Sequence, residues 1–180
     1  MSVTVRTLIY QPTNNSLYVF FIKFLLWSAI FQFAVWQLHH HAFLSDLLLN
    51  ALAQLAEKFS SLFTDNILLD TNKLIHADTG RYIVIDSQCS GLSLIATLLA
   101  AFCSLTNKIS EKLVMSLIAI VAIQTLNILR ISHLFFEIKH PTNHFDIYHL
   151  YVWQLINFVF AMGLFYQLQL YFVKVEGSKK

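Results

Sequence analysis

Charged and chain-breaking residues are both scarce in this sequence of 180 residues. Asp, Glu, Lys and Arg make up 12% of it, and it holds 4 glycines and 2 prolines, whereas soluble domains carry roughly 25% charge. Because 57% of the residues are hydrophobic and 14% are aromatic, the composition excludes disordered, collagen-like and linker-rich chains. The net charge of +2 is too small to indicate a nucleic-acid partner. The composition therefore predicts an integral membrane protein.

Cysteine is also rare. Only Cys89 and Cys103 occur, and on a continuous helix their separation corresponds to about 21 Å, which is too far for a disulfide. No two cysteines have the spacing of a metal-binding or redox motif. We therefore expect neither a metal nor another cofactor.

Long apolar segments predict an all-α polytopic membrane protein with one membrane domain, residues 1–180. Four segments have the length and apolar character of transmembrane helices: about 17–38, 88–106, 113–136 and 150–173. The first lacks the small-residue cleavage site of a signal peptide, so we expect it to be retained.

The distribution of basic residues predicts the orientation of these spans. On one side lie Arg6, Lys108, Lys112, Lys174, Lys179 and Lys180, and on the other Lys58, Lys73, Arg81 and Lys139. The larger group lies in short flanks, where the positive-inside rule acts. Both termini and the loop 107–112 are therefore expected in the cytoplasm, inside a plasma (inner) membrane. Segments 39–87 and 137–150 then face outward.

The outward segment 39–87 contains two predicted elements. Residues 42–63 have the pattern of an amphipathic helix, which favours a position in the membrane interface over a further span. Its expected apolar face consists of Leu47, Leu48, Leu52, Leu55 and Phe59. If this helix spans instead, the amino terminus moves outside. In the residues that follow, the hydrophobic pattern has a period of two. This pattern predicts a small β-meander with strands near 66–70, 73–77 and 81–86.

A cysteine stands at the predicted start of the second span. Asp86 or Ser87 can cap the helix, which puts Cys89 in its first turn. Unpaired N–H groups and the positive end of the helix dipole both favour a thiolate over a thiol. A free cysteine is otherwise more often a small packed hydrophobe, so both interpretations stay open. Ser90 and Gly91 follow directly.

Polar residues recur at steps of three along the span 113–136. They are Gln124, Asn127, Arg130 and His133. A guanidinium in an apolar span costs at least ~2.5 kcal/mol near the membrane centre, and Arg130 lies about 9 Å below the outer end of its helix. We therefore expect Arg130 to face the bundle interior and to have a partner, with a structural ion pair as the alternative to a functional role.

The last span opens with His149, followed on the same predicted face by Trp153 and Asn157. A lone histidine at a membrane boundary is more often an interfacial anchor. The last three predicted spans alternate in direction, however, so Cys89, Arg130 and His149 fall on one side of the membrane. A thiol, a guanidinium and an imidazole there can act as nucleophile, anion stabiliser and proton-transfer group.

This ordered set resembles the exosortase/archaeosortase family. The resemblance rests on the sequence Cys-Ser-Gly-Leu entering a span, Asn-x-x-Arg late in the next span and a histidine opening the one after, within roughly residues 83–160. It implies a membrane cysteine transpeptidase or protease with Cys89 as nucleophile, Arg130 as stabiliser and His149 as proton carrier. Asn127, Ser90 and Gly91 are the candidate supporting residues.

The resemblance also implies a substrate class. Such enzymes cut a C-terminal sorting signal from exported proteins, where the signal comprises a short motif, a hydrophobic helix and a basic tail. The product passes through a thioester to an acceptor nucleophile on the extracytoplasmic face. The implied partners are those exported proteins, membrane lipid and an unknown acceptor.

Two features depart from the family pattern. Many members have about twice as many spans, so this chain resembles a short version. The family histidine is usually followed four residues later by glycine, whereas here that position is Trp153. His144 and His133 are therefore alternative proton carriers.

Two other function classes stay open. Eight histidines suggest a haem- or metal-binding membrane bundle. Only His133 lies inside a predicted span, however, and the run at residues 39–41 indicates an interfacial tract. A non-catalytic membrane assembly subunit would carry Cys89 without needing its thiol.

Overall fold

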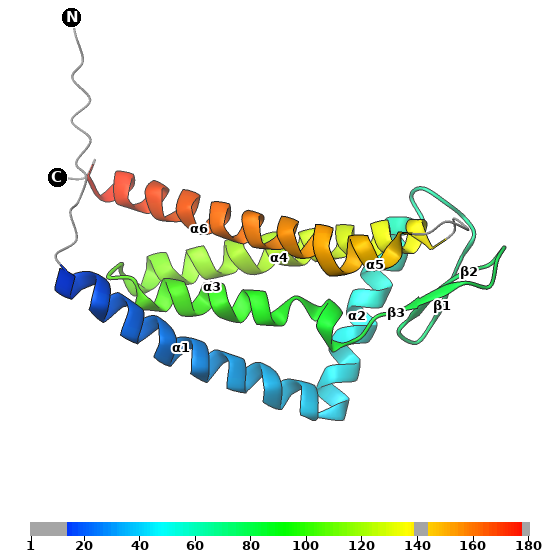
Figure 1. Cartoon of the computed structure of the whole chain (residues 1–180), viewed down its shortest axis with the longest axis horizontal. Coiled ribbons are helices and arrows are strands. Elements are labelled where there is room, and N and C mark those ends of the chain that lie inside the picture. The colour runs from blue at the N-terminus through cyan, green and yellow to red at the C-terminus, as the bar shows by residue number, and fades with distance from the viewer. Residues whose placement is uncertain (1–13, 139–143, 178–180) are drawn as a thin grey trace, which may run out of the picture.

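The computed structural model describes residues 14–138 and 144–177. They form an elongated helical bundle with a small three-stranded sheet at one end (Figure 1), in agreement with the predicted helical membrane protein. Four basic residues used in the orientation prediction lie outside the described residues: Arg6, Lys139, Lys179 and Lys180.

Three helical stretches are long and apolar enough to cross a membrane. They are Leu17–His40, Ile109–Glu137 and Phe145–Phe172. The first two belong to α1 (Asn14–His40) and α4 (Ile109–Glu137). The third runs through α5 (Phe145–Ile147), the π-helical turn η2 (Tyr148–Val152) and α6 (Trp153–Gly177). Among the described residues, three of the four predicted spans therefore have helices of sufficient length, and the second, at 88–106, does not.

The segment predicted as the second span, 88–106, is a short helix. α3 (Leu92–Ser104) has 13 residues and is about 20 Å long, against a membrane hydrocarbon core of about 30 Å. A 3-10 turn, η1 (Ser87–Ser90), precedes it. Between them Gly91 has a φ of 69°, in the left-handed region that interrupts a continuous helix. A hydropathy profile does not register such a break, which is why the sequence predicted a longer helix.

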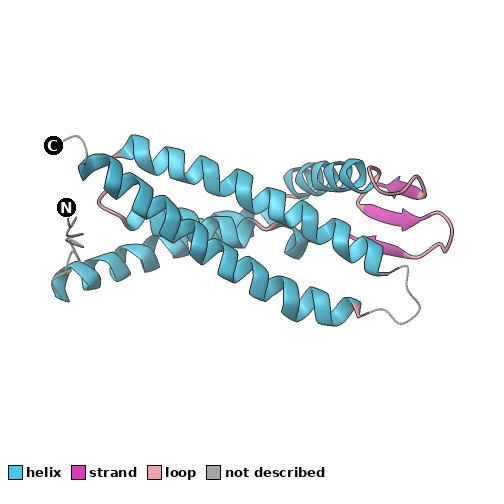
Figure 2. Ribbon diagram, turned by 90° about the horizontal axis from the view of Figure 1, so that it is seen from above, coloured by secondary structure: helices cyan, strands magenta, loops and turns pink. Residues whose placement is uncertain are grey.

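The two ends of the bundle carry different parts of the chain. The start of α1, the connection from α3 to α4 and the end of α6 lie at one end (Figure 1). The sheet and the start of α5 lie at the other end, with α2 nearby, and Figure 2 shows the same separation from above. This grouping agrees with the predicted topology, whereas the assignment of one end to the cytoplasm stays a prediction.

The amphipathic helix α2 (Ala42–Ser60) runs across the direction of the bundle helices (Figure 1), an orientation that favours the interfacial position over a span. Its buried face consists of Ser45, Leu49, Leu52, Ala53, Ala56 and Ser60. Of the predicted apolar face, Leu52 is buried and Leu48 packs against buried residues, whereas Leu47 and Leu55 are 59% and 51% exposed. Small side chains make close helix contacts in membranes, while larger apolar side chains suit lipid. Hydrophobicity alone therefore does not identify the packed face.

The β-meander is confirmed. β1 (Ile67–Asp70), β2 (Lys73–His76) and β3 (Tyr82–Val84) form an antiparallel sheet in the order β1-β2-β3. Leu74 and Ile83 are directly paired across β2 and β3, and both are buried. The sheet thus has one face against the protein, as the period of two predicts.

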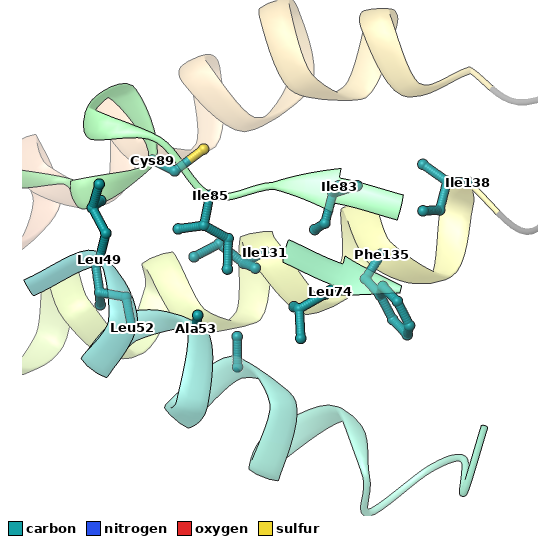
Figure 3. Packing of buried hydrophobic residues seen from close by; sticks show 11 residues of the cluster. Leu49, Leu52, Ala53, Leu74, Ile83, Ile85, Cys89, Ile131, Phe135 and Ile138 are labelled. Carbon is teal, nitrogen blue, oxygen red and sulfur yellow. The ribbon is translucent and has the colours of Figure 1, made fainter. Parts of the chain in front are cut away.

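Buried apolar residues form two separate clusters. The site-end cluster joins α2, the sheet and α4 (Figure 3). It comprises Leu49, Leu52, Ala53, Ala56, Leu74, Ile83, Ile85, Cys89, Ile131, Phe135 and Ile138. The far-end cluster joins α3, α4 and α6 through Ile95, Leu98, Phe102, Met115, Ala119, Ile123 and Ala161. Between them α4 carries buried Asn127 and Arg130.

Candidate active site

Cys89 lies in the η1 turn, which is built by its neighbours. The Asp86 carboxylate accepts hydrogen bonds from the backbone N–H groups of Gln88 and Cys89, at 3.0 and 3.1 Å. The Ser90 hydroxyl donates to the Ser87 carbonyl at 2.7 Å. Asp86 is thus the cap, as predicted, but Cys89 precedes α3 instead of lying in its first turn. The N–H groups beside the thiol already have an acceptor in Asp86.

The Cys89 side chain is only 8% exposed and belongs to the site-end cluster. Figure 3 shows its sulfur pointing away from Leu49 and Ile85. Burial raises the pKa of the Cys89 thiol above its ordinary value of 9.0, and the positive charge of Arg130 acts in the opposite direction without overcoming it. The sequence left a stabilised thiolate and a packed thiol both open. Burial favours the thiol form, because the desolvation of a buried thiolate outweighs the attraction to Arg130.

Two side chains of α4 hold the turn in place. The Asn127 amide donates to the Cys89 carbonyl, and the Gln124 amide donates to the Ser90 carbonyl at 3.1 Å. Irregular backbone that is buried in the protein needs such partners, because it has no regular secondary-structure bonds of its own. Asn127 was expected to be a supporting residue, and its side chain holds the backbone of the cysteine turn through this bond.

Arg130 and His149 are in direct contact. Arg130 is 7% exposed, and its Nη2 donates to His149 Nδ1 at 3.3 Å. The partner that Arg130 was expected to have is therefore an imidazole. The Arg130 Nε has no hydrogen-bond partner among the described residues. The His149 ring also stacks on Phe145, with 5.4 Å between ring centroids and 9° between planes.

A cavity of about 540 Å³ unites the thiol and the imidazole. It is lined by Tyr82, Ile83, Val84, Ile85, Asp86, Cys89, Ile131, Leu134, Ile138, Phe145, Asp146 and His149. A second cavity of about 240 Å³ is lined on its polar side by Ser87, Gln88, Ser90, Asn127, Arg130, Gln154 and Asn157. Arg130 lines the second cavity and reaches His149 of the first. The structure therefore brings together the three residues that the sequence selected.

The two alternative histidines lie elsewhere. His133 accepts a hydrogen bond from the Trp153 indole at 3.3 Å and lines neither cavity. His144 precedes α5, and its backbone N–H donates to a Glu137 carboxylate oxygen at 3.3 Å. Trp153, which stands where the family pattern usually has glycine, thus packs against His133 and not against His149.

Sequence reasoning missed His39. Its Nε2 lies 3.5 Å from the hydroxyl of Ser90, the neighbour of Cys89. In the sequence His39 stands out only as one of three consecutive histidines. That run indicated an interfacial tract and gave no sign that His39 contacts the cysteine turn. Among the described residues, no three His, Cys, Asp or Glu side chains are placed to hold a metal ion.

Comparison with known proteins identifies the family. A family model described as transmembrane exosortase matches residues 13–166, further toward the amino terminus than the resemblance that the motifs carried. The comparisons with curated proteins and with solved structures gave no match. Because the family model covers most of the chain, the chain belongs to the transmembrane exosortase family.

Proposed function

We propose that this member of the exosortase family is a membrane cysteine transpeptidase. The observation that carries the proposal is the convergence of Cys89, Arg130 and His149. Cys89 and His149 line one cavity, and His149 accepts a hydrogen bond from Arg130. This combination supplies a nucleophile, a proton carrier and a stabiliser of negative charge, which acyl transfer to a thiol requires.

The resting hydrogen bond defines the first proton transfer. His149 Nδ1 accepts from Arg130, so a neutral ring carries its proton on Nε2. When a substrate carbonyl enters, Arg130 turns to its oxygen and frees Nδ1 to accept the thiol proton of Cys89. The sulfur then bonds to the carbonyl carbon, and the guanidinium stabilises the oxyanion. Thiol activation thereby follows substrate arrival, which suits a cysteine whose resting pKa is raised.

The remaining steps restore the enzyme. The His149 imidazolium gives a proton to the leaving amine as the C–N bond breaks, and the acyl group remains on Cys89 as a thioester. An amine, hydroxyl or water then loses its proton to His149 and attacks the thioester carbon. The C–S bond breaks, and Cys89 recovers its proton from His149.

The proposed substrates are exported proteins with a C-terminal hydrophobic helix and a basic tail. Such a helix can lie beside the bundle in the lipid, with its outer end at the level of Cys89. The active site would then face the extracytoplasmic side of the plasma membrane. Lys108 and Lys112 at the opposite end of the bundle (Figure 1) support this placement, since basic residues in short loops favour the cytoplasmic side.

The test uses tagged exported proteins from the same genome that end in a hydrophobic helix and a basic tail. Each is co-expressed with the wild-type chain or with single-cysteine variants, and its size is followed by immunoblot. Cys89→Ala should leave the substrate at full length, because no other thiol lines either cavity among the described residues. Cys103→Ala is the matched control and should process normally. Normal processing by Cys89→Ala would end the transpeptidase proposal.

A further inference from the structure

β3 is an edge strand of the sheet, and it forms one wall of the cysteine cavity. The sheet order β1-β2-β3 leaves one side of β3 without a partner strand among the described residues. Tyr82, Ile83, Val84 and Ile85 line the cavity together with Cys89. An edge strand at the wall of a reaction cavity can receive an extended peptide by main-chain hydrogen bonding.

The register shows which backbone groups face the open side. In antiparallel pairing, alternate residues direct both their N–H and C=O groups to the partner. The His76 N–H donates to Arg81 O at 2.8 Å, and the Ile85 N–H donates to Asn72 O at 2.9 Å. With Ile83 opposite Leu74, the odd-numbered residues bond to β2. Tyr82 and Val84 therefore direct their backbone groups to the open edge, and their side chains are 56% and 47% exposed.

The chain direction sets the direction of an incoming peptide. β3 runs toward the η1 turn that holds Cys89, after which α3 enters the bundle (Figures 1 and 3). A substrate anchored by a C-terminal membrane helix runs the same way, from its exported part to the scissile bond and then into the lipid. Its residues before the scissile bond would therefore lie parallel to β3.

We propose that the substrate segment ahead of the scissile bond binds as a fourth strand, parallel to β3, through the backbone groups of Tyr82 and Val84. This proposal rests on the proposed function and adds the binding mode. Alternate side chains of that strand face the wall formed by Ile131, Leu134 and Ile138, which are apolar and largely buried. The enzyme then recognises an extended segment with an apolar residue at every second position on that face.

Cysteine cross-linking tests the strand addition. Tyr82→Cys, Val84→Cys and the control Leu68→Cys are each made in a Cys89→Ala, Cys103→Ala background, which binds substrate without cutting it. Leu68 is 56% exposed on β1, at the opposite edge of the same sheet. The probe is a tagged exported protein whose cleavage depends on Cys89, with single cysteines placed before its cleavage site. Disulfides are formed in membranes with copper phenanthroline.

Parallel addition predicts an ordered pattern. Position 84 should cross-link to a residue nearer the cleavage site, and position 82 to one two residues further from it, several-fold above the Leu68→Cys control. The reverse order, or equal cross-linking at Leu68→Cys, would overturn the strand addition. If cleavage depends on Cys89 but positions 82 and 84 do not cross-link, this inference fails and the proposed function stands. If no probe depends on Cys89, both fail.

Discussion

At the level of single residues, Arg130 combines burial, charge and an unused donor. Its Nη2 contacts His149, while its Nε has no partner among the described residues. A planar guanidinium can release His149 and present two donors in a fixed geometry to a carbonyl oxygen, which a lysine ammonium at the end of a flexible chain does not reproduce.

We therefore expect Arg130→Lys to lose most of the activity, nearly as much as Arg130→Ala. A donor aimed at a developing oxyanion contributes roughly 2.7–4 kcal/mol, which corresponds to about 10²–10³-fold in rate. The measurement is the rate of substrate processing at equal membrane abundance, with the melting temperature of each purified variant as a check on folding. A lysine variant within a few-fold of wild type would reduce Arg130 to a source of charge.

The reactivity of the thiol should depend on pH in a defined direction. Because burial raises the pKa of Cys89 above 9.0, the thiolate fraction should keep increasing from pH 7 to pH 9 without levelling off. Iodoacetamide labelling of the Cys103→Ala variant in membranes should follow that increase. Removing the charge in Arg130→Ala should raise the pKa further and slow labelling at each pH. A rate that levels off below pH 8 would contradict the raised pKa.

The catalytic candidates were predictable because they are chemically out of place. A guanidinium in an apolar helix demands a partner, and the alternation of spans pointed to the end where Cys89 and His149 lie. The pKa direction was not predictable, because it depends on how α2, the sheet and α4 enclose the thiol. Neither was the contact of His39 with Ser90, since nothing in the sequence links α1 to the cysteine turn.

At the level of elements, the junction between η1 and α3 depends on one backbone conformation. Gly91 has a φ of 69°, and a Cβ there would lie 3.6 Å from Asn127. That distance is an ordinary contact, so the cost of a side chain is strain and not a clash. A non-glycine residue in this region costs roughly 1–2 kcal/mol.

Gly91→Ala should therefore lower the thermal stability of the purified protein and weaken processing, since the turn that carries Cys89 must shift. Gly163→Ala is the matched control, because Gly163 lies within α6 and no atom lies within 4 Å of its added Cβ. Alanine favours helix there, so that variant should be as stable as wild type or more so. Equal melting temperatures for Gly91→Ala and wild type would show that the turn tolerates another conformation.

The elements differ in how far sequence patterns predict them. The three strands followed from alternation, because in each strand more exposed residues alternate with less exposed ones. The packed face of α2 did not follow from the sequence. Leu47 and Leu55 are as apolar as Leu49 and Leu52, but the first pair is exposed and the second pair is buried. In a membrane protein, lipid and protein both accept apolar side chains, so the pattern marks a helix without marking its neighbours.

At the level of the whole molecule, the two ends of the bundle should face different compartments. Ser110 lies at the start of α4, at the same end of the bundle as the start of α1 (Figure 1). Thr79 lies in the turn between β2 and β3, at the opposite end of the bundle. Both residues are exposed. The density of basic residues near Ser110 predicts that it is cytoplasmic.

A membrane-impermeant maleimide should therefore label Thr79→Cys but not Ser110→Cys in intact cells, in a background without Cys89 and Cys103. Labelling of both after permeabilisation provides the control for reactivity. Labelling of Ser110→Cys in intact cells would invert the proposed orientation and place the cavity in the cytoplasm.

The far-end cluster has a consequence for the electrical properties of the membrane. The proposed acyl-transfer site needs water and polar substrates, and its cysteine turn lies level with the end of α1, where His39 contacts Ser90. Below the polar groups of α4, Phe102, Met115 and Ala119 are fully buried between α3, α4 and α6. An ion crossing that layer would lose its hydration without gaining a partner. If the cavity is the proposed reaction site, this layer would insulate the membrane beneath it, so that a wet site would not become a leak for protons or salt.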